Sequence, residues 1–147
     1  MKKIKKVLIT GAAGLCGSVL YDGLIKKGYK IICCDKKITP SNAAKKIKLK
    51  VSDKIKKIDL KNFKSLVKIT KGIDAVIHFG GIPRHTPKED IYSKILENNI
   101  SGTYNLFEAC RINRVKRIIF ASSAHVIGFH NRKNRIDEKC TLRPDSH

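Results

Sequence analysis

Three glycines spaced three residues apart follow directly on the apolar residues 7–9: they are Gly11, Gly14 and Gly17. Glycine has no Cβ, so it allows a sharp turn and lets a ligand or a second element approach the backbone closely. We expect a buried strand, a tight turn and the start of a helix, whose free N–H groups and partial positive charge suit phosphate groups. An acidic residue about 20 positions further on would complete a pattern typical of a dinucleotide-binding turn.

Asp35 is that acid, 21 residues after Gly14 and at the end of the apolar run 31–34. At the tip of a second strand, a carboxylate can accept hydrogen bonds from both hydroxyls of an adenosine ribose, and it would repel a 2′-phosphate. NAD is therefore favoured over NADP, although Lys36 and Lys37 could soften this preference; the alternative is a surface aspartate that ends a strand. The residues of this region that we assign to cofactor binding are Gly11, Ala13, Gly14, Leu15, Cys16, Gly17 and Asp35.

Two further strand ends carry candidates for cofactor contacts. One is at the end of a weak strand over 55–58, where a carboxylate can reach an adenine amino group and a leucine can touch the ring. The other follows the apolar strand over 74–79, where paired glycines again suggest backbone that lies close to a ligand. The candidates from these two positions are Asp59, Leu60, Phe79, Gly80 and Gly81.

The longest predicted helix covers residues 89–113. Steps of three and four residues give it an inner face, which consists of Ile91, Ile95, Leu96, Asn99, Thr103, Leu106, Phe107 and Cys110. Asn99 is a further cofactor candidate, because a buried amide must find hydrogen-bond partners. Before this helix, His78 has no second His or Cys at metal-ligand spacing, so we expect a buried histidine satisfied by hydrogen bonds and no metal site.

Apolar runs and helical periodicity alternate along the chain. Strands are expected at 5–10, 30–35, 55–58, 74–79 and 116–121, with helices at 14–27, 63–72 and 89–113 between them. This order predicts an α/β fold with one Rossmann-like, doubly wound parallel sheet of five strands in the order 3-2-1-4-5. The buried face of the first helix is expected to consist of Cys16, Val19, Leu20, Gly23, Leu24 and Lys27.

Ser122 and Ser123 follow the last of these strands. In open parallel sheets, ligands bind in the crevice outside the carboxyl ends of the strands. Both serines are therefore candidates for contact with a ligand.

Length and charge limit the possible functions. The chain has 147 residues, and we assign residues 1–147 to one domain. No apolar run is long enough to cross a membrane, and the absence of a cleavage site argues against a signal peptide. The net charge of +20 suggests a nucleic-acid binder, but 25 of the 32 basic residues are lysines, spread mostly along the first half of the chain. Arginine is preferred for phosphate and base contacts, so we expect no specific nucleic-acid partner.

The five cysteines are an odd number, and no two of them form a Cys-x-x-Cys pair. Three or four lie in segments that we expect to be buried. They indicate small apolar residues in a reducing environment, which predicts a cytoplasmic protein.

Taken in order, these motifs resemble one enzyme superfamily. They are Thr-Gly-x-x-Gly-x-x-Gly at 10–17, Asp35, Asp59-Leu60, His-Phe-Gly-Gly at 78–81, Asn-x-x-Gly-Thr at 99–103 and Phe-Ala-Ser-Ser-x-x-Val-x-Gly at 120–128. The set resembles the extended short-chain dehydrogenase/reductase superfamily, which includes NAD-dependent sugar epimerases and dehydratases. The resemblance implies a Rossmann fold, bound NAD(P), a sugar or sugar-acid substrate, and a catalytic Ser, Tyr and Lys.

Within this superfamily, residues 76–82 and 120–129 are most similar to uronate dehydrogenases, which tend to have a His at the position of His125. Such a His can donate a hydrogen bond to a sugar hydroxyl or carboxylate. By this resemblance, Ser123 is the catalytic serine and hydrogen-bonds the reacting hydroxyl, while Ser122 and His125 bind the substrate. The implied reaction oxidises a uronic acid at its anomeric carbon to a lactone.

Two residues depart from the uronate dehydrogenase pattern. Pro83 stands in place of a substrate-contacting Ser, and Ala124 stands in place of an Asn. A different sugar acid or an aldose therefore remains open as the substrate. The alternatives are a nucleotide-sugar epimerase or dehydratase of the same superfamily, or a non-catalytic NAD-binding module.

The resemblance also implies a general-base Tyr with a Lys four residues later. No such Lys follows any of the four tyrosines, which are Tyr21, Tyr29, Tyr92 and Tyr104. Residues 143–147 match the family segment that leads into the catalytic Tyr. We therefore expect an N-terminal portion that is truncated before the catalytic helix, is inactive alone and exposes apolar surface beside the long helix. A homodimer, or association with a separate C-terminal half, is the expected assembly.

Overall fold

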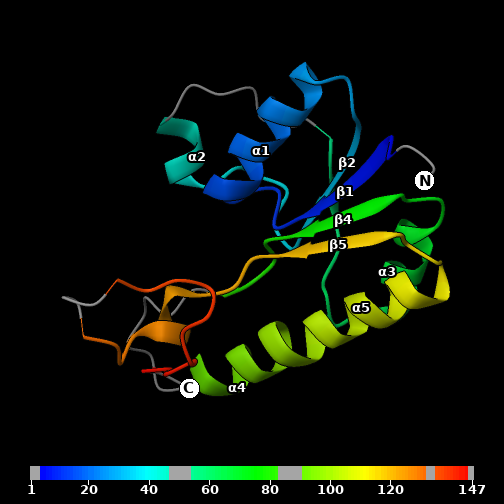
Figure 1. Cartoon of the computed structure of the whole chain (residues 1–147). Helices are drawn as coiled ribbons and strands as arrows, with labels where there is room; N and C mark the ends of the chain where they lie inside the picture. Colours follow the sequence, from blue (N-terminus) through cyan, green and yellow to red (C-terminus); the bar gives the residue numbers. More distant parts are fainter. Residues whose placement is uncertain (1–3, 47–53, 83–90, 132–134, 146–147) are drawn as a thin grey trace.

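The computed structural model describes residues 4–46, 54–82, 91–131 and 135–145. Within these ranges, five parallel strands form one sheet in the order β3-β2-β1-β4-β5 (Figure 1). The strands are β1 (Lys6–Thr10), β2 (Lys30–Asp35), β3 (Ile55–Lys57), β4 (Ala75–His78) and β5 (Arg117–Phe120). The predicted α/β class, parallel sheet and strand order are confirmed.

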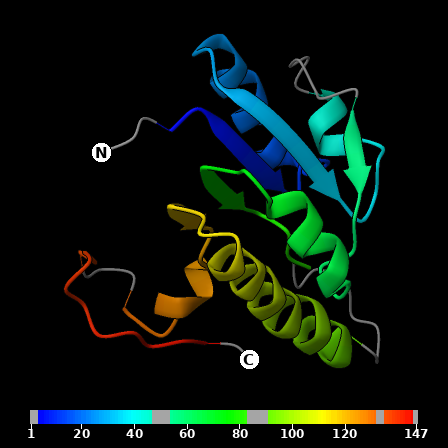
Figure 2. The ribbon, with the colours of Figure 1, turned by 90° about the vertical axis from the view of Figure 1, so that its right-hand side faces the viewer.

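Helices cover both faces of the sheet (Figure 1 and Figure 2). One face carries α1 (Leu15–Lys26) and α2 (Asn42–Lys46), and the other carries α3 (Phe63–Thr70) and a long helix. The long helix consists of α4 (Ile91–Ile95), the π-helix η1 (Leu96–Ser101) and α5 (Gly102–Ile112), and the 3₁₀-helix η2 (Ala124–Ile127) follows β5. Among the described residues, no helix is both long enough and apolar enough to cross a membrane.

The core is divided between the two faces of the sheet. Successive residues of a strand point to opposite faces, and the fully buried Leu8 and Ile9 of β1 belong to different apolar clusters. Leu8 lies in the cluster that includes Leu66 of α3 and Leu106 of α5. Ile9 lies in the smaller cluster against which Leu24 of α1 packs. The central strand therefore joins both layers of helices.

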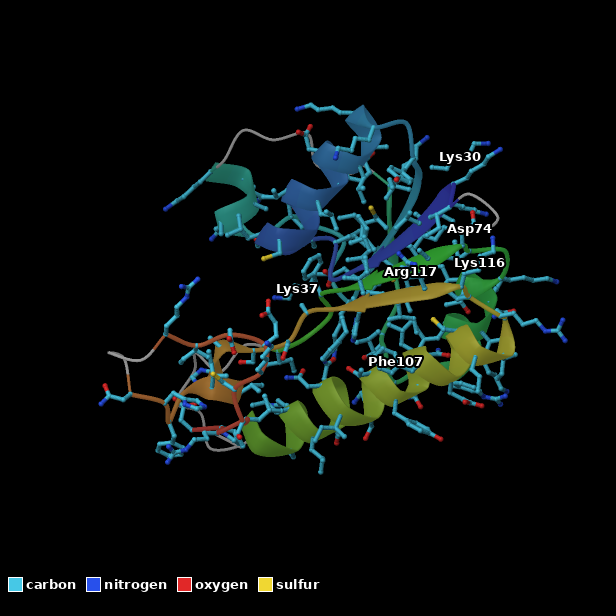
Figure 3. All side chains as sticks on the ribbon, in the orientation of Figure 1. Lys30, Lys37, Asp74, Phe107, Lys116 and Arg117 are labelled. Carbon is cyan, nitrogen blue, oxygen red and sulfur yellow. The ribbon has the colours of Figure 1, made fainter. Side chains whose placement is uncertain are left out.

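At the amino end of the sheet, Asp74 fixes the starts of neighbouring strands. Its carboxylate accepts hydrogen bonds from the backbone N–H groups of Lys5 (3.0 Å) and Lys6 (2.9 Å), and it pairs with Lys116 at 2.9 Å (Figure 3). The Lys116 ammonium and these two N–H groups hold the pKa of Asp74 well below its usual range. This one side chain connects β1 and the start of β5 to β4.

The buried face of α1 is rotated from the one expected. Its buried residues are Gly17, Ser18 and Asp22. The expectation was right for Leu20 and Leu24, which pack against the core, and wrong for Cys16, Val19, Gly23 and Lys27, which are exposed. The reason is a close backbone contact: a Cβ at Gly17 would lie 2.4 Å from the Gly11 carbonyl oxygen, so this side of the helix must face the turn.

The long helix also departs from simple periodicity. Leu96 was expected on the inner face but is 55% exposed. In the π-helix η1 the backbone hydrogen bonds span five residues and not four, so the 3.6-residue spacing does not hold across it. After η1 the regular spacing resumes, and Leu106, Ala109 and Cys110 form the buried side of α5.

Among the described residues, β5 is an edge strand of the sheet, and its apolar side chains are only partly covered. Ile119 is 51% exposed and Phe120 is 52% exposed. Phe107 of α5 meets Phe120 edge to face, with ring centroids 5.9 Å apart, and is itself partly exposed. This is the exposed apolar surface beside the long helix that the sequence predicts.

The five cysteines are all free thiols. Cys33, Cys34 and Cys110 are buried, as expected, while Cys16 is exposed and Cys140 is partly buried. Burial raises the pKa of the Cys34 thiol to about 12 and that of Cys110 to about 11. Both thiols therefore stay protonated and act as small core residues.

We predict that Gly17→Ala destabilises the fold by about 1–3 kcal/mol, because the new Cβ would overlap backbone atoms that cannot rotate away. Gly23→Ala is the matched control in the same helix. No atom lies within 4 Å of a Cβ at Gly23, so this change should stabilise the helix by about 0.5–1 kcal/mol. Urea denaturation measures both variants, and equal midpoints would contradict the close contact at Gly17.

Candidate functional site

Backbone hydrogen bonds connect the carboxyl ends of all five described strands into one edge. They are Ile58 N–H to Asp35 O (2.8 Å), Ala12 N–H to Cys34 O (3.2 Å), Phe79 N–H to Thr10 O (3.1 Å) and Ala121 N–H to His78 O (3.1 Å). The segments after β3, β2, β1, β4 and β5 therefore lie side by side. This edge brings together the strand-end residues selected from the sequence.

Gly11 makes the turn after β1 possible. Its φ of +70° lies in the left-handed region that favours glycine. A Cβ at this position would also lie 2.5 Å from the backbone carbon and oxygen of Phe79 and 2.7 Å from the nitrogen of Gly80. The turn and the segment after β4 are thus in direct backbone contact.

The start of α1 has the character of an anion site. Its N-cap is Gly14, which has no side chain to cap the first N–H groups, and no acidic residue lies in the first turn. No side chain of the helix itself therefore neutralises the partial positive charge of this helix end. Leu15 and Cys16 of this first turn are exposed, so a ligand can reach it.

Asp35 is held against this turn. One carboxylate oxygen accepts a hydrogen bond from the Ala13 N–H (3.0 Å), and the other accepts one from the Lys37 N–H (3.1 Å). Ala13 is buried, and its carbonyl accepts from the Ser41 N–H (2.8 Å). The backbone of Ala13 therefore positions Asp35.

Asp59 is a second carboxylate on the same edge. It pairs with Lys36 at 3.2 Å and accepts a hydrogen bond from the Lys61 N–H at 2.9 Å. Partial burial pushes the pKa of Asp59 upward, but the Lys61 N–H and the Lys36 ammonium outweigh it and hold the pKa below its usual value. Leu60 is only 7% exposed and fills space next to Gly102, so its contact with an adenine ring stays a prediction.

His78 is a satisfied core histidine, as predicted. Its Nδ1 lies 2.5 Å from the Thr10 hydroxyl and its Nε2 lies 3.0 Å from the Thr103 hydroxyl. The side chain is 2% exposed, and burial lowers the pKa of His78 to about 4. It is therefore neutral at pH 7 and links β1, β4 and α5. Within the described part of the chain, no group of His, Cys, Asp or Glu could hold a metal ion.

Asn99, in the π-helix, satisfies its amide on the segment after β4. Its Oδ1 accepts a hydrogen bond from the Ile82 N–H (2.8 Å), and its Nδ2 donates to the Ile82 carbonyl (3.0 Å). The predicted need for partners is confirmed, and Asn99 fixes the backbone next to Gly81. Its direct contact with a cofactor stays a prediction. Pro83 lies outside the described residues.

Ser122, Ser123 and His125 are exposed after β5. Ser123 is the N-cap of η2, where its hydroxyl accepts a hydrogen bond from the His125 N–H (3.2 Å). The His125 ring contacts Asp145, with Nδ1 and Oδ1 2.7 Å apart. Asp145 has no role that the sequence predicts, because it lies 20 residues from His125 in a segment without periodicity.

The sequence profile of the NAD dependent epimerase/dehydratase family matches residues 7–147. The chain belongs to this family. It is 39% identical over 142 residues to a uronate dehydrogenase of Pseudomonas putida, covering 97% of this chain and 49% of that protein. The chain thus spans about half the length of the curated relative it matches.

Solved structures agree with this assignment. A uronate dehydrogenase from Agrobacterium tumefaciens in complex with NAD has a TM-score of 0.77 and 31% identity, with 97% of this chain and 50% of that chain covered. MoeE5 in complex with UDP-glucuronic acid and NAD has a TM-score of 0.78 and 30% identity, with 95% and 43% covered. The predicted superfamily and Rossmann-like fold are confirmed, and NAD is the cofactor that the family description names.

We predict that acidification from pH 7 to pH 5 destabilises the fold by about 2 kcal/mol through His78 alone. The unfolded chain takes up a proton near pH 6.5, whereas folded His78 does so only near pH 4, so stability is lost as the pH falls. In His78→Gln, which has no titrating group there, this contribution should be absent. His130→Gln is the control and should retain it. Urea midpoints at both pH values measure the effect, and an equal loss in His78→Gln and the parent would contradict it.

Proposed function

We propose that this chain binds NAD at the carboxyl edge of its sheet and forms the cofactor-binding part of an NAD-dependent sugar oxidoreductase. The observation that carries the proposal is the combination of Gly11, the uncapped start of α1 and the fixed Asp35. Gly11 lets the backbone lie close to a dinucleotide, the start of α1 suits the charge of its phosphates, and Asp35 suits the hydroxyls of its ribose.

The residues present fit this cofactor. In our proposal, the first turn of α1 holds the pyrophosphate, Asp35 the adenosine ribose and Asp59 the adenine side. Phe79, Gly80 and Gly81 line the edge next to the turn, where Asn99 fixes their backbone. Asp35 and Asp59 are carboxylates on this edge, which favours NAD over NADP because they would repel a 2′-phosphate. Bound NAD⁺ supplies the hydride acceptor for oxidation of a sugar.

We further propose a uronic acid or related sugar as the substrate, oxidised at its anomeric carbon to a lactone. The similarity to uronate dehydrogenases and the presence of His125 support this choice. Ser123 would hydrogen-bond the reacting hydroxyl, and Ser122 and His125 would bind the sugar. The proton of that hydroxyl needs a general base, and no Tyr-x-x-x-Lys pair occurs in the 147 residues.

The alternative is a nucleotide-sugar epimerase or dehydratase of the same family. The similarity to MoeE5, whose structure contains UDP-glucuronic acid, favours this second candidate. A non-catalytic NAD-binding module is the third. Because no turnover is expected from the chain alone, binding of free uronates and of UDP-sugars to the chain with NAD separates the first two, and NAD binding without binding of either sugar fits the third.

Assembly and location are also proposals. We propose that residues 1–147 act as one NAD(P)-binding domain that associates with a second copy or with a separate C-terminal half, and that only the separate half would supply the base. The half-exposed Ile119 and Phe120 give such a partner an apolar surface. Five free thiols suit a reducing cytoplasm.

We predict that Gly14→Val and Asp35→Ala each weaken NADH binding at least about tenfold, which corresponds to about 1.4 kcal/mol. Gly14 has an ordinary extended backbone (φ −74°, ψ 169°), but the Cβ of a valine would lie 3.2 Å from the Gly11 carbonyl oxygen, and its methyl groups would occupy the phosphate approach. Glu108→Ala on the exposed side of α5 is the control. Titration followed by NADH fluorescence measures the affinities, and unchanged affinity in both site variants would refute the site.

We also predict no turnover when the purified chain is given NAD⁺ with galacturonate, glucuronate or UDP-glucose, because it lacks the Tyr and Lys of the general base. NADH absorbance follows the reaction. If the chain shows a rate and Ser123→Ala abolishes it, the 147 residues suffice for catalysis. The proposal that the general base is missing would then be wrong.

A further inference from the structure

We propose that Asp145 is a positioning residue: it holds His125 as the tautomer protonated at Nδ1, so that Nε2 accepts a hydrogen bond from a sugar hydroxyl. The sugar as the ligand rests on the proposed function above. The pairing of the two side chains does not, and it can be tested without substrate.

Asp145 contacts His125 twice. The Asp145 N–H donates to the His125 carbonyl oxygen (3.1 Å), and the Asp145 Oδ1 lies 2.7 Å from the His125 Nδ1. An ionised carboxylate only accepts hydrogen bonds, so Nδ1 must carry the proton. A neutral imidazole has a single N–H, which leaves the lone pair on Nε2.

The surrounding backbone fixes the segment that carries Asp145. The Arg143 N–H donates to the Val126 carbonyl (2.9 Å), and the Phe129 N–H donates to the Arg143 carbonyl (3.0 Å). Together with the Asp145 N–H, these bonds attach the segment to η2 and the residues just after it. The carboxylate is therefore presented to the ring by a frame that is itself hydrogen-bonded.

Gly128 leaves space for this carboxylate. A Cβ at Gly128 would lie 2.0 Å from the carboxyl carbon and one carboxyl oxygen of Asp145. The backbone does not require glycine here, because φ −62° and ψ −29° are open to any residue. The absent side chain at Gly128 thus serves the contact between Asp145 and His125.

The pair lies beside the serine proposed to meet the reacting hydroxyl. The His125 N–H donates to the Ser123 hydroxyl (3.2 Å), and the His125 side chain is 56% exposed. A ligand can therefore reach the ring without a rearrangement of the core. With a lone pair on Nε2, the neutral ring binds a hydroxyl and not a carboxylate, because two acceptors do not form a hydrogen bond. This selects between the two sugar groups that a histidine at this position could contact.

The test is a long-range ¹H–¹⁵N NMR spectrum of the ¹⁵N-labelled chain, with the His125 signals assigned by His125→Asn and recorded at a pH where the ring is neutral. We expect a protonated Nδ1 and an unprotonated Nε2. Asp145→Ala and Gly128→Ala should each shift the tautomer ratio about tenfold toward Nε2–H, the factor that matches loss of one charge-assisted hydrogen bond. Glu138→Ala, an exposed acid in the same part of the chain, is the control and should leave the ratio unchanged.

Gly128→Ala keeps the His125 ring and the Asp145 carboxylate but displaces the carboxylate from the ring. It therefore distinguishes loss of the contact from loss of the negative charge. The amide spectrum of each variant reports whether the chain is folded, and Asp145→Asn replaces Asp145→Ala if that variant is not. An Nε2–H tautomer in the parent, or the same ratio in the parent and all folded variants, would overturn the proposal. Galacturonate added with NAD⁺ should shift the Nε2 signal. If the tautomer is as expected and Nε2 does not respond to any uronate, the proposed substrate fails while the pairing stands.

Discussion

Two pairs of backbone segments meet around the turn after β1 with no space for a Cβ between them. Gly11 lies against the backbone of Phe79 and Gly80, and Gly17 lies against the carbonyl of Gly11. Backbone atoms cannot turn away as a side chain can, so these contacts determine where α1 begins and how it is rotated on the sheet. The positive end of α1, the end of β4 and the carboxylate after β2 come together because this turn is tight.

Local groups, and not the net charge, give the site its character. The net charge of the chain is +20. The edge that we assign to NAD nevertheless contains two carboxylates and a helix N-terminus. At the opposite edge, Asp74 gathers Lys116 and the N–H groups of Lys5 and Lys6 for a purely structural purpose. In our proposal, the same kind of side chain serves ligand recognition at one end of the sheet and strand alignment at the other.

Much of the fold follows from the sequence because apolar runs and glycines act locally. The strand order, the turn at Gly11 and the buried, satisfied His78 were all predictable in this way. Rotation of α1 was not, because it depends on a contact between Gly17 and a backbone oxygen that periodicity does not encode. Leu96 was misplaced because a π-helix breaks the spacing. The contact between Asp145 and His125 was not predictable, because the two residues lie 20 positions apart in a segment without a repeating pattern.

The way in which Asp35 is held has a consequence for how a ligand would meet it. A carboxylate offers about four lone-pair directions, and the N–H groups of Ala13 and Lys37 use two of them. About two remain, which is the number that the paired hydroxyls of one ribose require. The carboxylate is also already immobilised by the chain, so binding does not have to restrict its rotation. The fold thus reduces the entropy cost of recognition. It also determines how many further hydrogen bonds the Asp35 carboxylate can accept.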